Sequence, residues 1–344
     1  MKTVTVNASK SYAIKIGPGL LSTLGEEVRA LGKAKKIAIV SESNVYPLYG
    51  KQAEASLQQA GFQVVSFVFP AGEESKSATT YLELLNYLAE CKLTRTDLIV
   101  ALGGGVVGDL AGFAAATYLR GIRFIQIPTT RLAAVDSSVG GKTAIDLPAG
   151  KNLVGAFWQP SLVLCDTDTL TSLPRDIFLD GCAEVIKYGI LYDEAFFASL
   201  EATGPDFDRE TVIARCVEMK RDVVMEDEFD TGARMKLNLG HTIGHGVEAS
   251  SNFSLSHGKS VAIGMAIVSR ASHCADNERI IAILEKFGLP TTTTTDADTL
   301  FRYALSDKKR SGGTVNLIIP RTIGNCDIVP TPVENIKSFI EEGL

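Results

Sequence analysis

The sequence has little cysteine, and no two of its six cysteines form a C-x-x-C pair. They are scattered over positions 91, 165, 182, 216, 274 and 326. This spacing argues against a disulfide framework and indicates small apolar side chains that are buried in a reducing compartment. The first residues, MKTVTVNASK, contain no apolar core of a signal peptide, so the expected location is the cytoplasm.

The sequence also lacks a long uninterrupted apolar run and an excess of positive charge. Its most hydrophobic run, 98–119, contains Asp109 and several glycines, so a strand, a turn and a helix describe it better than a membrane span. A net charge of −6 argues against a general binder of nucleic acids or anionic membranes. We therefore expect neither a membrane nor a nucleic-acid partner.

The first half of the chain alternates strand-like runs, rich in Val, Ile and Leu, with segments of helical spacing. The predicted strands are 12–16, 36–40, 62–69, 97–102, 123–127 and 161–165. The predicted helices between them are 20–31, 46–60, 77–92 and 106–119. This alternation indicates an α/β domain whose parallel sheet is covered by helices on both faces.

From about residue 172 the predicted elements are mostly helical. The predicted helices are 174–191, 209–226, 233–250, 258–276, 278–287 and 332–342, with one pair of strands near 314–328. A chain of 344 residues is long for a single core. We therefore predict two domains, an α/β domain over 1–171 and a mostly α-helical domain over 172–344.

Three of the four histidines, His241, His245 and His257, lie within seventeen residues of one another. On a helix, His241 and His245 would lie on one face, about one turn apart. Glycines alternate with them, which indicates that another segment packs very close. Core or capping histidines are the alternative, but the clustering favours a metal or catalytic site. A zinc site of this kind needs a further ligand from elsewhere in the chain.

Glu184 is the candidate for that further ligand. It lies three residues before Lys187 in the otherwise apolar segment 181–191. A surface ion pair is the alternative interpretation. The apolar neighbours favour burial, and a buried carboxylate needs a cation or a metal ion beside it.

Residues 97–119 indicate a buried strand, a glycine turn and a helix. Gly103, Gly105 and Gly108 fit the pattern G-x-G-x-x-G, which can place backbone N–H groups and a helix N-terminus against phosphate. No acidic residue follows about 20 positions later, so this is not the usual dinucleotide fingerprint, and a tight turn without a ligand is the alternative. We expect Asp109 at the start of the helix, where it would favour the helix dipole.

Residues 128–155 are predicted to form a long functional loop without clear regular structure. Thr129 and Thr130 follow a predicted strand, and Lys142 and Lys151 lie in glycine-rich surroundings. A solvated loop is the alternative, but long loops are often binding elements, and these lysines could hold an anion. Further basic residues that would favour a small polyanion carrying phosphate and carboxylate are Lys220, Arg234, Lys308 and Lys309.

These features together resemble the 3-dehydroquinate synthase family, within the larger group that contains the metal-dependent glycerol dehydrogenases. The resemblance covers nearly the whole chain, and its motifs are highly specific in their order and spacing. They are GGGVVGD (103–109), YLRG (118–121), PTT (128–130), VDSSVGGKTA (135–144), GKNLVGAFWQP (150–160), AEVIKYG (183–189), LNLGHTIGH (237–245), LSHGKS (255–260) and DKK (307–309). The resemblance implies a Rossmann-like NAD-binding domain followed by a helical domain that binds metal and substrate.

The resemblance also implies a zinc or cobalt ion held by Glu184, His241 and His257. His245 would then be a catalytic proton-transfer or hydrogen-bonding residue, not a ligand. The other implied catalytic residues are Lys142, Lys187, Asp136 and Asn238. The implied substrate-binding residues are Arg120 from a second subunit of a homodimer, Lys142, Asn152, Lys187, Lys220, Arg234, Asn238, His245 and Lys309 (or Lys308).

NAD would lie along the glycine turn, with Glu42 at the adenosine ribose. The other implied cofactor-binding residues are Glu73, Lys76, Gly104, Gly105, Val106, Gly108, Asp109, Thr129, Thr130, Asp136, Lys142, Lys151, Thr169, Leu170, Thr171 and Ser172. The implied substrate is an anionic sugar phosphate, 3-deoxy-D-arabino-heptulosonate 7-phosphate. The implied reaction gives 3-dehydroquinate and phosphate, an early step towards aromatic amino acids, through transient oxidation by NAD, phosphate elimination, re-reduction, ring opening and intramolecular aldol closure.

Two other functions compete with this interpretation. An NAD-dependent polyol dehydrogenase of the same superfamily would release NADH, and a metalloprotein without NAD chemistry would need only the histidine cluster. The positions that depart from the pattern expected of the family are Glu42, Arg131, Ala134, Asp146 and Asp230. The segment VDSSVGGK, which related cyclases with other products usually change, is intact and favours the heptulosonate phosphate as substrate.

Overall fold

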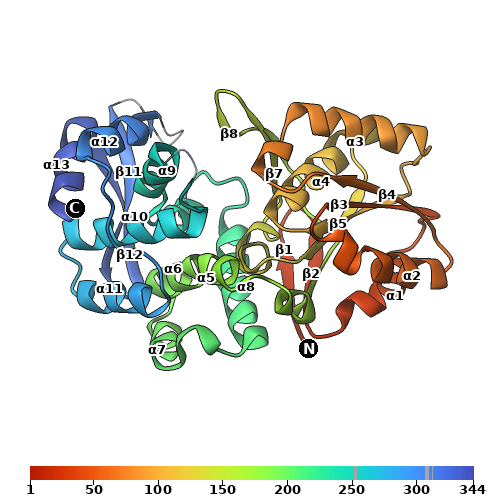
Figure 1. Ribbon diagram of the computed structural model, residues 1–344, viewed down its shortest axis with the longest axis horizontal. Coiled ribbons are helices and arrows are strands. Elements are labelled where there is room, and N and C mark those ends of the chain that lie inside the picture. The colour runs from red at the N-terminus through yellow and green to blue at the C-terminus, as the bar shows by residue number, and fades with distance from the viewer. Residues whose placement is uncertain (252–253, 307–309, 312) are drawn as a thin grey trace. The chain divides into compact units, whose positions relative to one another are not determined.

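The computed structural model describes residues 1–251, 254–306, 310–311 and 313–344. The chain forms two compact units, Met1–Pro174 with Arg209–Phe229 and Arg175–Asp208 with Asp230–Leu344 (Figure 1). The division proposed from the sequence, at 171/172, lies close to the end of the first stretch. The prediction assigned residues 209–229 to the second domain, whereas they belong to the first unit.

The first unit is built on a seven-stranded sheet with the order β1-β2-β9-β6-β5-β3-β4. Only β1 and β2 pair antiparallel, and the other pairings in this sheet are parallel. The strands are β1 (Lys2–Asn7), β2 (Ser11–Gly17), β3 (Lys36–Glu42), β4 (Gln63–Phe69), β5 (Leu98–Gly103), β6 (Arg123–Pro128) and β9 (Leu162–Asp166). The predicted parallel sheet is confirmed, and β1 is the strand that the prediction missed.

Helices cover both faces of this sheet. Successive strand residues point to opposite faces, so Ile99 packs on one side and Val100 on the other. On the side of Ile99 lie α3 (Ala78–Glu90) and α4 (Gly105–Thr117), which contribute residues such as Leu110. On the side of Val100 lie α1 (Leu24–Ala30) and α2 (Lys51–Gln59), which contribute Val28 and Leu57. The sheet is therefore the middle layer of three.

The prediction of a long irregular loop over 128–155 is wrong in its second half. A helical turn, η5 (Ala133–Ser137), is followed by β7 (Lys142–Leu147) and β8 (Gly150–Phe157), which pair antiparallel as a hairpin. Most of β8 is exposed, so it lacks the alternation of buried and exposed residues that reveals a strand in a sequence. The hairpin carries both lysines that the sequence placed in this segment.

The second unit consists mainly of helices. Its elements are α5 (Arg175–Asp180), α6 (Cys182–Tyr192), α7 (Glu194–Thr203), η8 (Ala233–Asn238), α9 (His241–Ser250), α10 (His257–Ala271), α11 (Asn277–Lys286), α12 (Ala297–Ser306), β10 (Arg310–Ser311), β11 (Thr314–Thr322), β12 (Asn325–Pro332) and α13 (Val333–Gly343). The prediction missed α7 and α12. A single helix over 233–250 is also wrong, because Gly240 has φ of 77° and separates η8 from α9.

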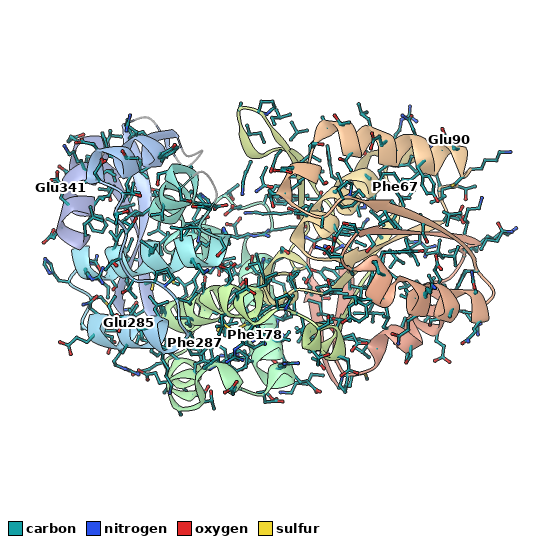
Figure 2. The ribbon with its side chains drawn as sticks, in the orientation of Figure 1. Phe67, Glu90, Phe178, Glu285, Phe287 and Glu341 are labelled. Carbon is teal, nitrogen blue, oxygen red and sulfur yellow. The ribbon has the colours of Figure 1, made fainter. Side chains whose placement is uncertain are left out.

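Apolar side chains fill the interior of this unit, and many of its charged side chains lie at the surface (Figure 2). Phe178 and Phe287 are buried, whereas Glu285 and Glu341 are exposed. This distribution is typical of a globular domain. Among the described residues, no helix is both long enough and apolar enough to cross a membrane.

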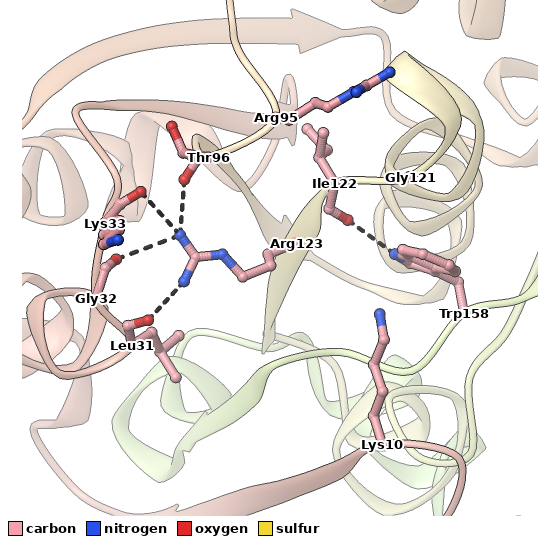
Figure 3. Close-up of a pocket in the computed structure, with 10 residues that line it drawn as sticks. All are labelled: Lys10, Leu31, Gly32, Lys33, Arg95, Thr96, Gly121, Ile122, Arg123 and Trp158. Atoms are coloured by element: carbon pink, nitrogen blue, oxygen red, sulfur yellow. Dashed lines mark hydrogen bonds between the residues drawn. The ribbon is translucent and has the colours of Figure 1, made fainter.

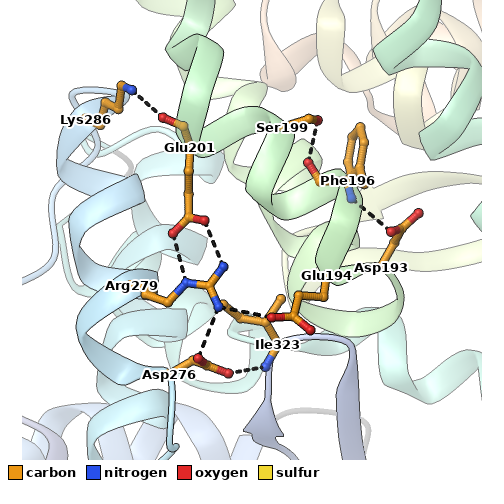
Figure 4. A network of polar contacts seen from close by, with 9 residues as sticks. All are labelled: Asp193, Glu194, Phe196, Ser199, Glu201, Asp276, Arg279, Lys286 and Ile323. Carbon is orange, nitrogen blue, oxygen red and sulfur yellow. Dashed lines mark hydrogen bonds and ion pairs between the residues drawn. The ribbon is translucent and has the colours of Figure 1, made fainter.

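A network of ion pairs holds α11 to α7 (Figure 4). The guanidinium of Arg279 lies 2.8 Å from Glu201, 3.2 Å from Glu194 and 3.2 Å from Asp276. The other oxygen of Asp276 accepts a hydrogen bond from the backbone N–H of Ile323 at 2.9 Å. Three carboxylates share one cation, so this network is a structural tie between helices and not a cation-binding site.

Candidate active site

Two helices of the second unit begin at a histidine, α9 at His241 and α10 at His257. Their backbones touch, because a Cβ added to Gly264 would lie 2.0 Å from the carbonyl oxygen of Gly240. A Cβ added to Gly244 would lie 2.8 Å from a backbone oxygen of α10. The close neighbour expected from the glycines is therefore α10, and these glycines are required for the approach of the two helices.

Asp180 fixes the start of α10. Its carboxylate accepts a hydrogen bond from the backbone N–H of Lys259 at 2.9 Å and a short one from the hydroxyl of Ser256. A Cβ on Gly258 would lie 2.0 Å from the carbonyl oxygen of Asp180. Asp180 is thus a positioning residue for His257, and the sequence analysis missed it because the two are far apart in the chain.

Glu184 of α6 lies between the two histidines. Its Oε1 is 3.4 Å from Nε2 of His241 and 3.4 Å from Nε2 of His257. The three donor atoms that these residues offer lie within 4.8 Å of one another, the one such group found in the described part of the chain. Two imidazole nitrogens and a carboxylate oxygen suit zinc or a similar divalent ion. The three residues therefore fit a metal ion.

His245 lies beside this group but is not part of it. Its ring centroid is 5.5 Å from that of His241 and 6.3 Å from that of His257. It projects from α9 one turn after His241 and is exposed. His245 is therefore a neighbour of the group and not a member of it.

Hydrogen bonds orient both imidazoles. Nδ1 of His241 lies 3.0 Å from the carbonyl oxygen of Leu239, so Nδ1 carries the proton and Nε2 remains for a metal. Nδ1 of His257 lies 3.5 Å from the carboxylate of Glu248, which is 7% exposed. The sequence analysis missed Glu248. Its spacing of seven residues from His241, two helical turns, is the signal that could have placed it on the same face.

The electrostatics of the group favour the ligand forms of Glu184 and His241, whereas His257 holds a proton that a metal ion must displace. Burial opposes ionisation of Glu184, but the neighbouring Lys187, itself 1% exposed, holds the pKa of Glu184 well below its usual range. Burial and Lys187 lower the pKa of His241 to about 4, so that imidazole is neutral at pH 7. Burial acts against protonation of His257, but hydrogen bonds to Glu184 and Glu248 outweigh it and raise its pKa to about 10. A metal ion would displace the proton that His257 shares with Glu184.

We expect Glu248→Ala to weaken zinc binding by roughly 10- to 100-fold, because outer carboxylates that hold a ligand imidazole have effects of this size. Glu248→Gln keeps an oxygen that can accept the Nδ1–H hydrogen bond, so its loss should be smaller. Competition with a chromophoric chelator measures the affinity without any assay of activity. Glu285→Ala, which removes an exposed carboxylate from α11, is the matched control, and an affinity for Glu248→Ala equal to that of this control would contradict the role.

In the first unit, Lys76 is the centre of a second polar cluster. Its Nζ lies 2.6 Å from Asp109, 2.5 Å from Oδ1 of Asn152 and 3.9 Å from Glu73. Burial opposes the charge of Lys76, but Asp109 and Glu73 raise its pKa, so the ammonium stays charged. The expectation that Asp109 starts the helix is wrong, because α4 begins at Gly105 and Asp109 lies in its second turn. In this position it pairs with Lys76.

The glycine turn before α4 packs closely against its surroundings. A Cβ on Gly104 would lie 3.0 Å from the side chain of Thr130, and one on Gly105 would lie 3.3 Å from Oγ of Ser137. Gly104 is the N-cap of α4 and supplies no capping side chain, so the first N–H groups of the helix can face an anion. The turn can therefore receive an anionic group such as a phosphate.

Most of the other predicted cofactor residues lie at the same edge of the sheet. Glu42 ends β3, Gly103 ends β5 and Thr129 follows β6, and in a parallel sheet these carboxyl ends are neighbours. The segment Thr169–Ser172 follows β9 and is held by the hydroxyl of Tyr49, which donates to the carbonyl of Thr169 at 3.0 Å. A ligand bound outside this edge would meet all of these segments.

Four predicted site residues of the first unit form two further pairs that the sequence analysis did not predict. Nζ of Lys220, on α8 (Arg209–Glu226), lies 3.0 Å from Oδ1 of Asp136 and donates to its carbonyl oxygen at 2.6 Å. Nζ of Lys151 lies 3.9 Å from Glu73. Lys142 is exposed at the start of β7. These contacts place basic side chains beside the residues of η5 and of the β7–β8 hairpin.

Arg120 is not brought to this edge. It is exposed and follows α4, whose N-terminus lies at the glycine turn. A helix of 13 residues spans about 20 Å, so the start of α4 and Arg120 lie at opposite ends of that helix. In the second unit, Arg234 is 2% exposed and the amide of Asn238 donates to the carbonyl of Met235 at 3.1 Å. Lys308 and Lys309 lie outside the described residues.

Comparisons with known proteins identify relatives of nearly the whole chain. Residues 66–180 match the family described as 3-dehydroquinate synthase N-terminal, and residues 181–310 match its C-terminal counterpart. A 3-dehydroquinate synthase of Pelobacter propionicus is 47% identical over 98% of this chain and 99% of its own length. A 3-dehydroquinate synthase of Caulobacter vibrioides is 46% identical over 100% of this chain and 99% of its own length.

Solved structures resemble the chain over its whole length. A 2-deoxy-scyllo-inosose synthase complexed with carbaglucose-6-phosphate, NAD+ and Co2+ is 26% identical, with a TM-score of 0.87 over 100% of both chains. A 2-epi-5-epi-valiolone synthase from Streptomyces hygroscopicus, with NAD+ and Zn2+ bound, is 26% identical, with a TM-score of 0.88 over 98% of both chains. Glycerol dehydrogenase from Schizosaccharomyces pombe, at 18% identity and a TM-score of 0.66 over 95% of this chain and 87% of its own, shares the fold.

Proposed function

The chain belongs to the 3-dehydroquinate synthase family, and we propose that it converts 3-deoxy-D-arabino-heptulosonate 7-phosphate to 3-dehydroquinate and inorganic phosphate. It is a phosphate-eliminating lyase of the shikimate pathway. The observation that carries the proposal is the presence in one chain of the group Glu184, His241 and His257 and of a glycine turn before α4, the helix whose Asp109 pairs with Lys76. The first fits a divalent metal, and the second fits a dinucleotide and a phosphate.

The cofactors are NAD and a zinc or cobalt ion, in agreement with the related cyclases that contain them. When bound, NAD accepts and returns a hydride while the metal, as a Lewis acid, lowers the pKa of a substrate hydroxyl. Glu184, His241 and His257 hold the metal in this proposal. The residues around the glycine turn, Lys76 and Asp109 among them, hold the dinucleotide.

The remaining polar residues bind and orient the substrate. His245, exposed and one turn after His241, exchanges a proton with a substrate hydroxyl. Lys142, Asn152, Asn238 and a lysine of the pair 308–309 bind the phosphate group. Lys220 and Arg234 bind the substrate carboxylate, and Asp136 and Lys187 orient the reacting hydroxyls. The carbon–oxygen bond to phosphate breaks with its electrons on the leaving oxygen, and the phosphate oxygens take the proton from the neighbouring carbon.

We further propose a homodimer located in the cytoplasm. Arg120 lies at the far end of α4 from the glycine turn of its own chain. In a two-fold dimer, each subunit would extend the segment that carries Arg120 to the other subunit. Arg120 would then bind the phosphate group in the partner's site. The other binding partner is the small anionic sugar phosphate, and no nucleic-acid or membrane partner is expected.

An assay with a catalytic amount of NAD tests the proposed reaction. The heptulosonate phosphate should release phosphate for many turnovers, because each hydride that NAD accepts is returned to an intermediate. Absorbance of NADH at its characteristic wavelength should therefore not rise steadily. One NADH formed per substrate consumed would instead support the polyol dehydrogenase that shares this fold.

A further inference from the structure

A pocket of about 440 Å³ lies in the first unit, at the opposite end of the strands from the glycine turn (Figure 3). Its walls come from the loops that precede β3, β5 and β6. Lys10, between β1 and β2, and Trp158, just after β8, complete them. The basic side chains in its lining are Lys10, Lys33, Arg95 and Arg123, and among the residues that the structure describes no acidic one lines it. The pocket therefore gathers positive charge on a chain whose net charge is −6.

Arg123 builds the floor of the pocket. Its guanidinium donates to the carbonyl oxygens of Leu31 at 2.6 Å, Thr96 at 2.7 Å and Gly32 at 3.3 Å. These bonds tie the loop before β3 to the loop before β5. Asp97 adds to this tie, because its carboxylate accepts from the backbone N–H of Lys36 at 2.9 Å. The two loops are thus fixed before any ligand binds.

Trp158 forms one wall and holds a cation. Its indole N–H donates to the carbonyl of Ile122 at 2.9 Å, and Nζ of Lys10 lies 3.7 Å from the ring centroid. A Cβ on Gly121 would lie 2.6 Å from the Trp158 ring, so only glycine at this position leaves room for the indole. Burial beside the ring lowers the pKa of Lys10, which means that its ammonium has lost part of its hydration. An anion bound in the pocket would replace the water molecules that the Lys10 ammonium has lost.

We propose that this pocket binds a phosphate-class dianion, either inorganic phosphate or a small phosphate ester, through Lys10, Lys33 and Arg95. In the described part of the chain, no hydrogen bond or ion pair occupies the side-chain charge of Lys33 or Arg95. Three basic groups that line one preformed pocket suit a ligand with two negative charges. The proposal does not depend on the catalytic function, since the pocket lies away from the proposed cofactor edge.

Trp158 is the only tryptophan of the chain, so its fluorescence reports on the pocket directly. We expect sodium phosphate, added at constant pH and ionic strength, to change the fluorescence with saturation at a concentration of about 1 mM, as a weak specific site would. Lys33→Ala/Arg95→Ala should raise the half-saturating concentration at least fivefold, and Lys33→Gln/Arg95→Gln should do the same. A parallel titration with glycerol phosphate distinguishes the two sources, because an ester site would saturate at a lower concentration of the ester.

Two variants serve as controls. Lys2→Ala/Lys51→Ala removes two exposed lysines of the same unit outside the pocket and should leave the titration unchanged. Lys142→Ala, which removes a proposed phosphate contact of the catalytic site, should also leave it unchanged. The proposal is overturned if phosphate gives no saturable change, if Lys142→Ala abolishes the change, or if Lys33→Ala/Arg95→Ala raises the half-saturating concentration no more than Lys2→Ala/Lys51→Ala does. A change in Trp158 fluorescence that depends on protein concentration and not on phosphate would also overturn the proposal. A second copy of the chain, and not an anion, would then cover the pocket.

Discussion

His257→Ala should lose its bound zinc, whereas His245→Ala should retain one zinc per chain and lose turnover. His257 places Nε2 3.4 Å from Oε1 of Glu184, within the group of converging donors, and His245 contributes no donor to that group. Zinc sites with four protein ligands contribute about 10–16 kcal/mol, so one lost ligand costs about 3 kcal/mol, or roughly 100-fold in affinity. Metal content after dialysis against a chelator measures the difference.

The matched control is His273→Ala, which removes an exposed histidine paired with Glu342 at 2.8 Å. It should alter neither metal content nor activity. Restoring zinc or cobalt to the chelated wild-type protein should restore activity, which shows that the loss was not caused by unfolding. Equal loss of metal from His245→Ala and His257→Ala would mean that the pair spaced by four residues supplies the ligands, and the assignment given above would be wrong.

Two inactive variants, Arg120→Ala and His257→Ala, should restore activity to each other when their subunits are mixed. Arg120 follows a helix about 20 Å long that begins at the glycine turn, so it lies far from that turn in its own chain. If it acts on the partner's site, a mixed dimer has one site with both an intact His257 and a borrowed intact Arg120. Random re-association makes about half of the dimers mixed, so activity should reach about a quarter of that of the wild type.

The control for this experiment is each variant alone, carried through the same dissociation and re-association. Each should stay nearly inactive. Native mass spectrometry of differently tagged subunits shows whether mixed dimers have formed. If they form and activity does not recover, Arg120 acts within its own chain or has no role in binding phosphate.

The sequence predicted the central sheet well because its strands are buried on both faces. Strands such as Leu98–Gly103 are continuous apolar runs, and the prediction needed only local composition. It missed β1, and it missed β8 because that strand is largely exposed and contains two glycines. Where burial does not impose a pattern, a sequence contains little information about a strand.

The converging metal group followed from rare residues, whereas its supporting contacts did not. Three clustered histidines mark the segment by their number alone, but the choice of His257 over His245 came from family resemblance and not from spacing. Glu248 and Asp180 hold His257 in place through contacts between separate helices. The pair of Lys76 with Asp109 likewise joins two distant segments. Such long-range contacts depend on tertiary packing, which a single sequence does not specify directly.

The return of the chain to the first unit over 209–229 bears on the order of events during synthesis. Helix α8 packs against β1, β2 and η5, and its Lys220 bonds to Asp136. When the ribosome has completed β9, the nascent chain therefore contains every strand of the sheet but not the helix that covers its first hairpin. The buried side chains Val4 and Val6 of β1 contact water until residues of the next unit have also been made. A nascent chain that pauses near residue 174 would expose this apolar edge, so chaperone binding is expected to be strongest at that length.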